Sequence, residues 1–339
     1  MKSDSAAVSL PKALAIVSPE WGPHLYGPDE YAELSRHVEW IAPPLSAEDI
    51  RHRLDLLRDV EVIFAGWGTA VMDEAFMAAS PRLRAVFHAG GTIRYFVTEA
   101  FWRRGVVVAS GAAINALPVV EYTLAAILFS LRHGWFYARR AHLDGAFPAR
   151  RPIPGSYGTI IGLVSLGAIA RQVCTRLKSF DVKVIAYDPF ASSAEAAQLG
   201  VELVSLEEIF ARADVVSLHT PLLPETERLV TGAHFAAMKE GATFINTSRG
   251  AIVDEPAMIA VLAARPDLQA VLDVTWPEPP LPGSPLYGLP NVVLTPHLAG
   301  TTPREARRLG RAMVEEFHRW RRGEPLVHGI TYEEFSRCA

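Results

Sequence analysis

Residues 159–172 read TIIGLVSLGAIARQ, and this stretch decides the fold. TIIGLV is an apolar run typical of a buried strand, and the residues from Ala168 onward follow helical spacing. SLGAIA therefore occupies the turn from a strand into a helix, where free backbone N–H groups and the helix dipole attract an anion. The turn predicts a phosphate-binding site, although it contains a single glycine.

The dinucleotide fingerprint G-x-G-x-x-G uses its first glycine for the turn, its second for the approach of the pyrophosphate and its third for helix packing. The three positions here hold Ser165, Gly167 and Ala170. Gly167 keeps the middle role, and Ser165 costs about 1 kcal/mol if its position needs an unusual backbone angle. We expect Ser165, Gly167, Ala168 and Ile169 to contact the cofactor.

In VKVIAYDPF, residues 182–190, a second apolar run ends at Asp188, which lies 21 residues after Gly167. At this spacing a carboxylate accepts hydrogen bonds from the adenosine ribose hydroxyls, and its charge repels a 2′-phosphate. The sequence therefore predicts NAD rather than NADP. Taken alone, the pattern fits an ordinary turn of a parallel sheet equally well.

Short apolar runs alternate with helical patterns along nearly the whole chain. One series begins near residues 13, 60, 83 and 106, and a second begins at residue 159. This alternation predicts an α/β protein with two Rossmann-like or flavodoxin-like domains, each built on a parallel sheet. Two capping-box pairs mark helix starts: Ser46 with Asp49, and Ser205 with Glu208.

Two other stretches have a distinct character. PVVEYTLAAILFSLRH opens with Pro118, which suits a first helical turn, and its apolar residues cover nearly every face. We expect this helix to be buried between domains or subunits. Residues 276–290, WPEPPLPGSPLYGLP, lack periodicity and predict a long loop, of the kind that often carries function.

Composition excludes several classes of function. The balance of 33 Lys+Arg against 37 Asp+Glu, without a basic run, argues against a nucleic-acid partner. The first residues lack the apolar core of a signal peptide, and the longest apolar run, 122–131, is about half a membrane span, so we expect a cytoplasmic protein without a membrane partner. Cys174 and Cys338 cannot build a disulfide framework, and Cys174 is expected to be buried. No metal site is predicted.

Three later segments carry a resemblance. They are LHTPLLPETERL from Leu218, FINTSRGAIVDEPAMIAVL from Phe244, and VLDVTWPEPP with NVVLTPHLAG between Val271 and Gly300. In this order they closely resemble the D-isomer-specific 2-hydroxyacid dehydrogenase family, and the resemblance extends from about residue 83 to residue 308.

The resemblance implies a domain organisation. A Rossmann domain that binds NAD, residues 116–298, is expected to be inserted into a discontinuous substrate domain, residues 1–115 and 299–339. The implied reaction is hydride transfer between NAD(H) and a small 2-hydroxy or 2-keto acid. A homodimer is expected through the helix that starts at Pro118.

The resemblance also implies which residues act. The family's N-T-[SA]-R-G pattern carries the substrate-binding arginine, which is Arg249 in this sequence. Its D-V-x-x-x-E-P pattern carries the acidic partner, Glu278, and its T-P-H pattern carries the acid/base histidine, His297. All three positions hold the expected residue type.

The implied chemistry needs these residue types. A guanidinium grips a carboxylate through two parallel hydrogen bonds, which a lysine cannot copy. A histidine titrates near neutrality, so it can donate the proton in reduction and accept it in oxidation. A carboxylate on the far ring nitrogen would fix the tautomer, and Glu278 can supply it if the proline-rich loop folds back on the end of the TPH strand.

Further residues border the cofactor in the family. In this sequence they are His219, Thr220, Pro221, Thr247, Asp273 and His297. We interpret His219 as structural, or as an edge of the adenosine pocket, rather than as a second catalytic histidine. Asp273 either only ends a strand or contacts the nicotinamide side, and we favour the contact.

The substrate loop departs from the family pattern. GGTIRYFV, which starts at Gly90, replaces G-x-G-x-D-N-x-D, so the substrate class cannot be transferred. We expect Gly90, Gly91, Thr92 and Arg94 to border the substrate. Arg94 either recognises a second anionic group on the substrate or pairs with Glu99 at the surface.

Two alternatives stay open on the sequence alone. A non-enzymatic NAD-sensing scaffold of the same fold, as in corepressors that resemble this family, would explain the disturbed glycine pattern. A methyltransferase built on a related sheet would explain Asp188 but not the series Arg249, Glu278 and His297.

Overall fold

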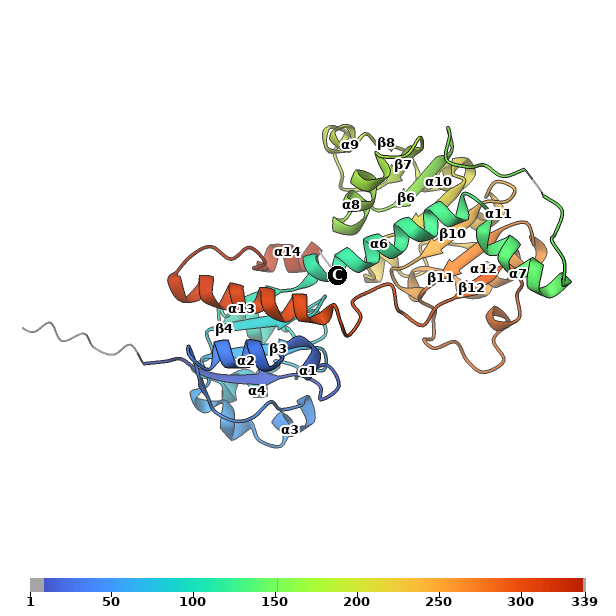
Figure 1. Ribbon diagram of the computed structural model, residues 1–339. Helices are drawn as coiled ribbons and strands as arrows, with labels where there is room; N and C mark the ends of the chain where they lie inside the picture. The colour runs from blue at the N-terminus through green and yellow to red at the C-terminus, as the bar shows by residue number, and fades with distance from the viewer. Residues whose placement is uncertain (1–8, 151, 338–339) are drawn as a thin grey trace, which may run out of the picture. The chain divides into compact units, whose positions relative to one another are not determined.

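The computed structural model describes residues 9–150 and 152–337 of the chain. The chain divides into two compact units (Figure 1). Unit 1 comprises Met1–Asn115 and Thr301–Ala339, and unit 2 comprises Ala116–Gly300. The sequence predicts boundaries after residues 115 and 298, and this division falls after residues 115 and 300.

Unit 1 is built on a five-stranded parallel sheet in the order β2-β1-β3-β4-β5, which is the flavodoxin-like order. Its strands are β1 (Lys12–Ile16), β2 (Glu39–Trp40), β3 (Val62–Gly66), β4 (Ala85–Ala89) and β5 (Val107–Ser110). Four of them are the predicted apolar runs. The sequence carries no signal for β2, because two residues at a sheet edge show no periodicity.

Helices pack on both faces of this sheet, because alternate strand residues enter two separate hydrophobic clusters. Ile63 and Ala65 of β3 enter one cluster, and Val62 and Phe64 enter the other. The helices are α1 (Gly22–Leu25), α2 (Pro28–Leu34), α3 (Ala47–Arg51), α4 (Glu74–Ala79), α5 (Glu99–Arg103), α13 (Ala306–Arg322) and α14 (Tyr332–Arg337), with a 3₁₀ helix at Leu54–Asp59. The predicted capping box of Ser46 begins α3.

Helix α14 packs against α5. The ring of Trp102 lies 5.3 Å from that of Phe335 and 5.7 Å from that of Tyr332. The Tyr332 hydroxyl also donates a hydrogen bond to Glu99 at 3.2 Å. Cys338 lies outside the described residues.

Unit 2 is built on a seven-stranded sheet in the order β12-β11-β10-β9-β6-β7-β8, with parallel pairing throughout. Its strands are β6 (Ile160–Val164), β7 (Lys183–Tyr187), β8 (Glu202–Leu203), β9 (Val215–Leu218), β10 (Thr243–Asn246), β11 (Gln269–Leu272) and β12 (Val292–Leu294). The strand order reverses between β6 and β9, which is where a Rossmann sheet binds its ligand. The predicted fold class, two parallel α/β sheets, is confirmed.

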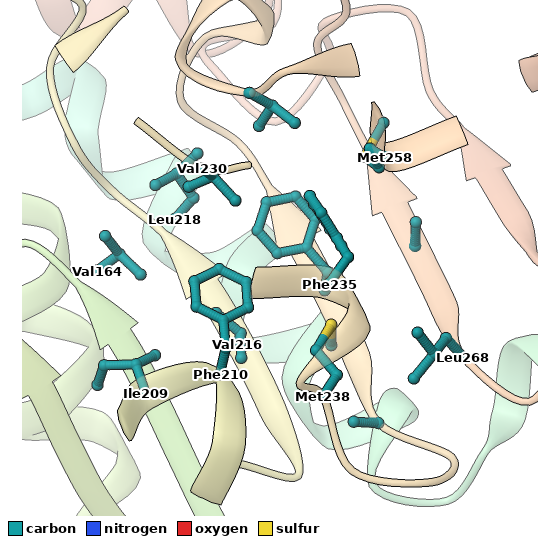
Figure 2. Packing of buried hydrophobic residues seen from close by; sticks show 14 of the residues in the cluster. Val164, Ile209, Phe210, Val216, Leu218, Val230, Phe235, Met238, Met258 and Leu268 are labelled. Carbon is teal, nitrogen blue, oxygen red and sulfur yellow. The ribbon is translucent and has the colours of Figure 1, made fainter. Parts of the chain in front are cut away.

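The unit 2 sheet is also covered on both faces. Its helices are α7 (Gly134–Asp144), α8 (Ala168–Leu177), α9 (Ser193–Leu199), α10 (Leu206–Arg212), α11 (Gly232–Ala236) and α12 (Glu255–Ala264), with 3₁₀ helices at Pro224–Thr226, Gly250–Ile252 and Pro285–Tyr287. Figure 2 shows one core cluster, in which Phe210 and Phe235 pack among smaller apolar side chains. The ring centroids of Phe210 and Phe235 lie 6.0 Å apart. Ser205 caps α10 as predicted.

Helix α6 is longer than its sequence pattern suggests. It runs over Ala112–Ser130, so the prediction that Pro118 opens it is wrong. The residues from Ala112 onward continue the same helical hydrogen bonding, and Pro118 removes only one donor from it. By length and composition α6 could cross a membrane, and 39% of its apolar window is buried inside the protein.

Two smaller predictions are also confirmed. Residues 276–290 form the expected long loop, with one 3₁₀ turn at Pro285–Tyr287. Cys174 is buried on α8, and burial raises the pKa of its thiol to about 11, which keeps it protonated and unreactive.

Candidate active site

The predicted catalytic and cofactor residues of unit 2 gather at one edge of its sheet. They follow successive strands: Ser165 after β6, Asp188 after β7, His219 after β9, Arg249 after β10, Asp273 after β11 and His297 after β12. Because all of these strands run parallel, their carboxyl ends meet at the same edge. The fold therefore brings together, in neighbouring loops, residues that are spread over more than 130 positions of the sequence.

Asp273 organises the end of this edge. Its side chain is 2% exposed, and its carboxylate accepts three hydrogen bonds. The donors are the Thr295 hydroxyl at 2.6 Å and the backbone N–H groups of Leu298 and Ala299, each at 2.9 Å. A buried carboxylate needs such donors, because an unpaired charge in the interior is costly. Asp273 thus ties down the segment on both sides of His297.

His297 has a left-handed backbone, with a φ of 52°. Its N–H donates to the carbonyl groups of Asp273 at 2.9 Å and Thr295 at 3.0 Å. A residue other than glycine in this region costs about 1 kcal/mol or more, so the surrounding hydrogen bonds must hold it. The sharp turn directs the imidazole to Glu278, whose Oε1 lies 2.6 Å from Nδ1.

Glu278 lies on the 276–290 loop, whose start is anchored to α12. The Glu255 carboxylate accepts a hydrogen bond from the Trp276 N–H at 2.9 Å. The Thr275 hydroxyl donates to the Pro277 carbonyl at 2.9 Å. The loop folds back on the end of β12 as the sequence analysis requires, which explains how Glu278 meets a histidine 19 positions away.

Arg249 is held next to this loop by its own neighbours. The Asn246 side-chain amide donates through its nitrogen to the Arg249 carbonyl at 3.1 Å. The Asn246 side-chain oxygen accepts from the Ser248 N–H at 2.9 Å. Gly250 allows the close approach, because a Cβ there would lie 2.0 Å from the Thr275 carbonyl carbon. The arginine loop and the start of the Glu278 loop are therefore in direct backbone contact.

The guanidinium of Arg249 keeps its charge and an exposed face. Desolvation by the surrounding protein lowers the pKa of Arg249, and the negative charge of Glu278 opposes this, so the two side chains lie within electrostatic range. One guanidinium nitrogen donates to the Ser248 carbonyl at 2.6 Å. Four donors remain for a ligand, which suits two parallel bonds to a carboxylate.

Two residues of this edge have contacts that the sequence analysis did not predict. Glu255 anchors the loop of Glu278, and Tyr122, from α6, bonds the Thr295 hydroxyl at 2.8 Å. Both lie in helices whose apolar spacing gives no reason to single them out. The one available signal is a polar side chain inside an otherwise apolar helix.

The turn after β6 has the geometry that a pyrophosphate needs. Ser165 has a φ of 75°, so its position requires the left-handed backbone that glycine adopts without steric cost. Its hydroxyl bonds that of Thr220 at 2.9 Å, and its N–H donates to the Tyr187 carbonyl at 2.7 Å. These bonds offset the strain of the serine.

Gly167 supplies open space at the start of α8. Its backbone is extended, and a Cβ there would meet no described atom within 4 Å. Neither strain nor internal packing therefore explains the glycine. It precedes a helix of 10 residues with no side-chain cap and no acidic residue in its first turn, so its N-terminal N–H groups can receive a phosphate. Ala170, 0% exposed, packs beneath.

Asp188 has a second task that the sequence does not reveal. Its Oδ2 accepts from the Leu166 N–H at 2.7 Å, and its Oδ1 accepts from Phe190 and Ala191 at 2.8 and 2.9 Å. The carboxylate thus links the turn after β6 to the turn after β7. An ionised carboxylate has about four acceptor positions, so one remains for a ribose hydroxyl.

The remaining predicted cofactor residues make the following contacts, and Thr220 is the one whose hydroxyl bonds the turn after β6. His219 pairs with the Ser217 hydroxyl at 3.0 Å, and burial lowers its pKa to about 4, so it is neutral near pH 7. Thr220 is buried and its carbonyl accepts from the Ser248 hydroxyl. The Pro221 carbonyl accepts from Thr226, the Thr247 hydroxyl lies 3.3 Å from that of Thr123, and Ile169 packs beside the core of α8. Ala168, the first residue of α8, is exposed.

The predicted substrate loop belongs to unit 1 and follows β4. Gly90 is required there, because a Cβ would lie 2.4 Å from the His88 ring. The Gly91 carbonyl accepts from Ser110 at 2.5 Å, and the Thr92 hydroxyl accepts from the Arg94 N–H at 3.2 Å.

Arg94 has a partner that neither sequence interpretation names. Its guanidinium lies over the ring of Phe335 at 4.9 Å and donates to the Phe335 carbonyl. Glu99, its suggested surface partner, accepts from Tyr332 instead. The charge of Arg94 thus fastens α14 to the loop after β4.

Residues 124–299, more than half of the chain, match the model of the NAD-binding domain of D-isomer specific 2-hydroxyacid dehydrogenases. The chain belongs to the D-isomer-specific 2-hydroxyacid dehydrogenase family. The match lies within unit 2 and contains the dinucleotide turn and the three predicted catalytic residues. The predicted family and the predicted NAD cofactor are both confirmed.

Several relatives within the family are similar over most of this chain. D-3-phosphoglycerate dehydrogenase of Mycobacterium tuberculosis is 35% identical over 85% of this chain and 54% of its own length. (S)-sulfolactate dehydrogenase of Chromohalobacter salexigens is 36% identical over 73% of this chain and 81% of its own. The chain spans about half the length of the D-3-phosphoglycerate dehydrogenases that it matches.

Two solved structures are similar to this chain over nearly its whole length. The TT0316 protein of Thermus thermophilus is 30% identical, with a TM-score of 0.73 over 94% of this chain and 100% of its own. The holo form of D-mandelate dehydrogenase from Rhodotorula graminis is 25% identical, with a TM-score of 0.79 over 95% of this chain and 98% of its own.

Replacing Gly167 with alanine tests the dinucleotide turn. A methyl group there meets no described protein atom, so we expect the melting temperature to stay unchanged. The affinity for NADH, measured by fluorescence titration, is expected to fall about tenfold or more, because the methyl group occupies the space of the phosphate. Gly288→Ala, in the 276–290 loop, is the matched control. Unchanged NADH affinity in Gly167→Ala would place the pyrophosphate elsewhere.

Proposed function

We propose that this protein is an NAD-dependent D-2-hydroxyacid dehydrogenase that converts a small 2-keto acid, NADH and a proton into a D-2-hydroxy acid and NAD⁺. The observation that supports this best is the pairing of His297 with Glu278, at 2.6 Å between Nδ1 and Oε1, beside the charged Arg249. The three groups are an acid/base, its orienting partner and an anion clamp. They meet at the edge where the dinucleotide turn also lies.

The cofactor has a defined set of protein partners in this proposal. The turn of Ser165 and Gly167 and the start of α8 hold the pyrophosphate, and Asp188 accepts from the adenosine ribose. A bound nicotinamide supplies the hydride in reduction and accepts it in oxidation. The protein supplies orientation and the proton.

Arg249 binds the carboxylate of the keto acid. Its planar guanidinium forms two parallel hydrogen bonds and fixes the rotation of the acid, which places the neighbouring keto group. A third donor of the same fork can polarise the keto oxygen. Desolvation lowers the pKa of Arg249, and the negative charge of Glu278 opposes that effect.

His297 moves the proton. Because Nδ1 is bound to Glu278, Nε2 is the nitrogen that can reach a ligand. In reduction the imidazolium donates from Nε2 to the keto oxygen, and Glu278 stabilises the charged ring before the transfer. In oxidation the neutral ring accepts the proton of the hydroxyl group.

The substrate is proposed only as a small 2-keto acid. The similar proteins are dehydrogenases of 3-phosphoglycerate, sulfolactate and mandelate, acids that differ beyond C2. The chain lacks the family pattern in the loop after Gly90, and the Arg94 charge is already engaged by Phe335. We therefore propose that Arg94 stabilises α14 and does not read a second anion.

The assembly and location follow from the sequence only. We propose a homodimer formed through α6, on which Phe129 is 43% exposed although most of the helix is apolar. A cytoplasmic location stays a prediction. The rival interpretation, an NAD-sensing scaffold, leaves the pairing of Glu278 with His297 without a purpose.

Oxidation of NADH with a panel of 2-keto acids tests the function. The panel includes glyoxylate, hydroxypyruvate, phosphohydroxypyruvate, and aromatic and branched keto acids. We expect at least one to be reduced, and chiral chromatography to identify its product as the D isomer. Binding of NADH without reduction of any acid would favour the scaffold.

Arg249→Lys tests the clamp on the best acid of that panel. The substitution keeps the charge but removes the fork, so kcat/KM is expected to fall about 100-fold or more. Arg212→Lys, at an exposed ion pair with Glu202, should retain wild-type kinetics. The clamp is excluded if Arg249→Lys behaves like Arg212→Lys.

The direction of the reaction should respond to pH. Reduction consumes the proton of His297 and oxidation needs the neutral ring, so the reduction rate is expected to fall with rising pH while the oxidation rate rises. Initial rates in both directions from pH 5 to 10 measure this. His297→Asn should abolish the opposite trends, and reduction that stays constant at alkaline pH would contradict the assignment.

Arg94→Ala separates its two roles. Loss of the contact with Phe335 is expected to lower the melting temperature. The ratio of kcat/KM for singly and doubly anionic keto acids should change by less than about twofold. A selective loss for the doubly charged acids would show that Arg94 binds the substrate.

A further inference from the structure

A chain of two side-chain hydrogen bonds connects α6 to the segment of His297. The Tyr122 hydroxyl lies 2.8 Å from the Thr295 hydroxyl, which lies 2.6 Å from the Asp273 carboxylate. A carboxylate only accepts, so the Thr295 proton is directed to Asp273. The Tyr122 hydroxyl must then be the donor to Thr295.

Tyr122 is suited to remain a donor. Burial raises the pKa of its phenol, and the nearby charge of Asp273 raises it further, while the bond to Thr295 has the opposite effect. The hydroxyl therefore keeps its proton over the range in which the protein works. A donor bonded to Thr295 also strengthens the next bond of the chain, because consecutive hydrogen bonds polarise one another.

The chain ends on the carboxylate that controls the turn of His297. The same carboxylate holds the N–H groups of Leu298 and Ala299, which immediately follow the histidine. Thr295 lies two positions before it, and its carbonyl accepts the His297 N–H. The left-handed backbone of His297 is thus bracketed by bonds that Thr295 and Asp273 supply.

We propose that Tyr122, acting through Thr295 and Asp273, is a positioning residue that fixes the direction of the His297 imidazole. The expected effect on kcat rests on the proposed function. The expected effect on the orientation of the His297 ring rests on the geometry alone. Among the described residues, Tyr122 makes no hydrogen bond to the His297 imidazole or to the Arg249 guanidinium, so we expect it to affect turnover rather than binding.

The competing interpretation is that Tyr122 only packs. Its ring lies at the margin of a core cluster, and a phenylalanine would fill the same space. Tyr122→Phe removes the hydroxyl and little else, so it separates packing from hydrogen bonding. Tyr157→Phe removes the hydroxyl group of a tyrosine in the same unit that is 88% exposed, and it is the matched control.

The first experiment uses the full chain without ligands. Nitrogen NMR of histidine-labelled protein reports the tautomer and mobility of the His297 ring, with His297→Asn to assign its signals. Wild type and Tyr157→Phe are expected to show one sharp set with the proton on Nδ1, toward Glu278. Tyr122→Phe is expected to broaden this set or split it between tautomers. An unchanged His297 signal in Tyr122→Phe overturns the proposal, whatever the enzyme does.

The second experiment measures steady-state reduction of the best keto acid. Tyr122→Phe is expected to lower kcat about tenfold while KM for the acid and for NADH changes less than about twofold. Thr295→Val should cause an equal or larger loss, and Thr295→Ser, which keeps the hydroxyl, should restore most of it. A change confined to KM, or failure of serine to restore kcat, overturns the proposal.

Two further readings keep these outcomes distinct. Melting temperatures show whether a variant is unfolded. If a Thr295 variant is unfolded, Tyr122→Phe still tests the proposal, because phenylalanine preserves the volume of the tyrosine ring. If the wild-type chain reduces no keto acid, the proposed function fails while the NMR comparison still decides whether Tyr122 positions His297.

Discussion

The buried carboxylate of Asp273 is the constraint on which the site depends. It is nearly inaccessible to water, and it accepts from Thr295 and from two backbone groups that follow His297. Those bonds support the left-handed backbone of His297, whose Nδ1 lies 2.6 Å from Oε1 of Glu278. In the proposed reaction, Nε2 is then the nitrogen that faces the substrate. Asp273 supports the turn that carries His297, and its predicted contact with the nicotinamide stays a prediction.

The same logic operates at the dinucleotide turn. Ser165 takes a backbone conformation that suits glycine, and hydrogen bonds to Thr220 and to the Tyr187 carbonyl compensate for it. Asp188 adds a bond across to Leu166. Loss of two glycines from the fingerprint thus need not disturb the phosphate position, because neighbouring side chains hold the turn. Of the three fingerprint positions, Gly167 is the one that combines an extended backbone with open space where a Cβ would lie.

Much of this could be predicted from sequence, for identifiable reasons. Hydrophobic periodicity and turn residues locate the longer strands. The strands β2 and β8 could not be predicted, because two residues show no periodicity. Arg249, Glu278 and His297 lie in motifs that resemble those of the family, and the resemblance implied that they converge. Contacts between segments that are far apart in the sequence could not be predicted. No sequence pattern directs the Arg94 guanidinium to Phe335 or the Asp188 carboxylate to Leu166, and Tyr122 looks like one more residue of an apolar helix.

A crystal structure of the protein with NADH and oxamate, an unreactive isostere of a small 2-keto acid, would show whether Arg249 and His297 act as proposed. We expect the oxamate carboxylate on the two terminal nitrogens of Arg249, and Nε2 of His297 within hydrogen-bond distance of the oxygen that stands for the keto group. We also expect Nδ1 to remain on Glu278 and the 297–299 turn to remain on Asp273. Oxamate bound away from Arg249, or an imidazole whose Nε2 faces away from it, would exclude these roles.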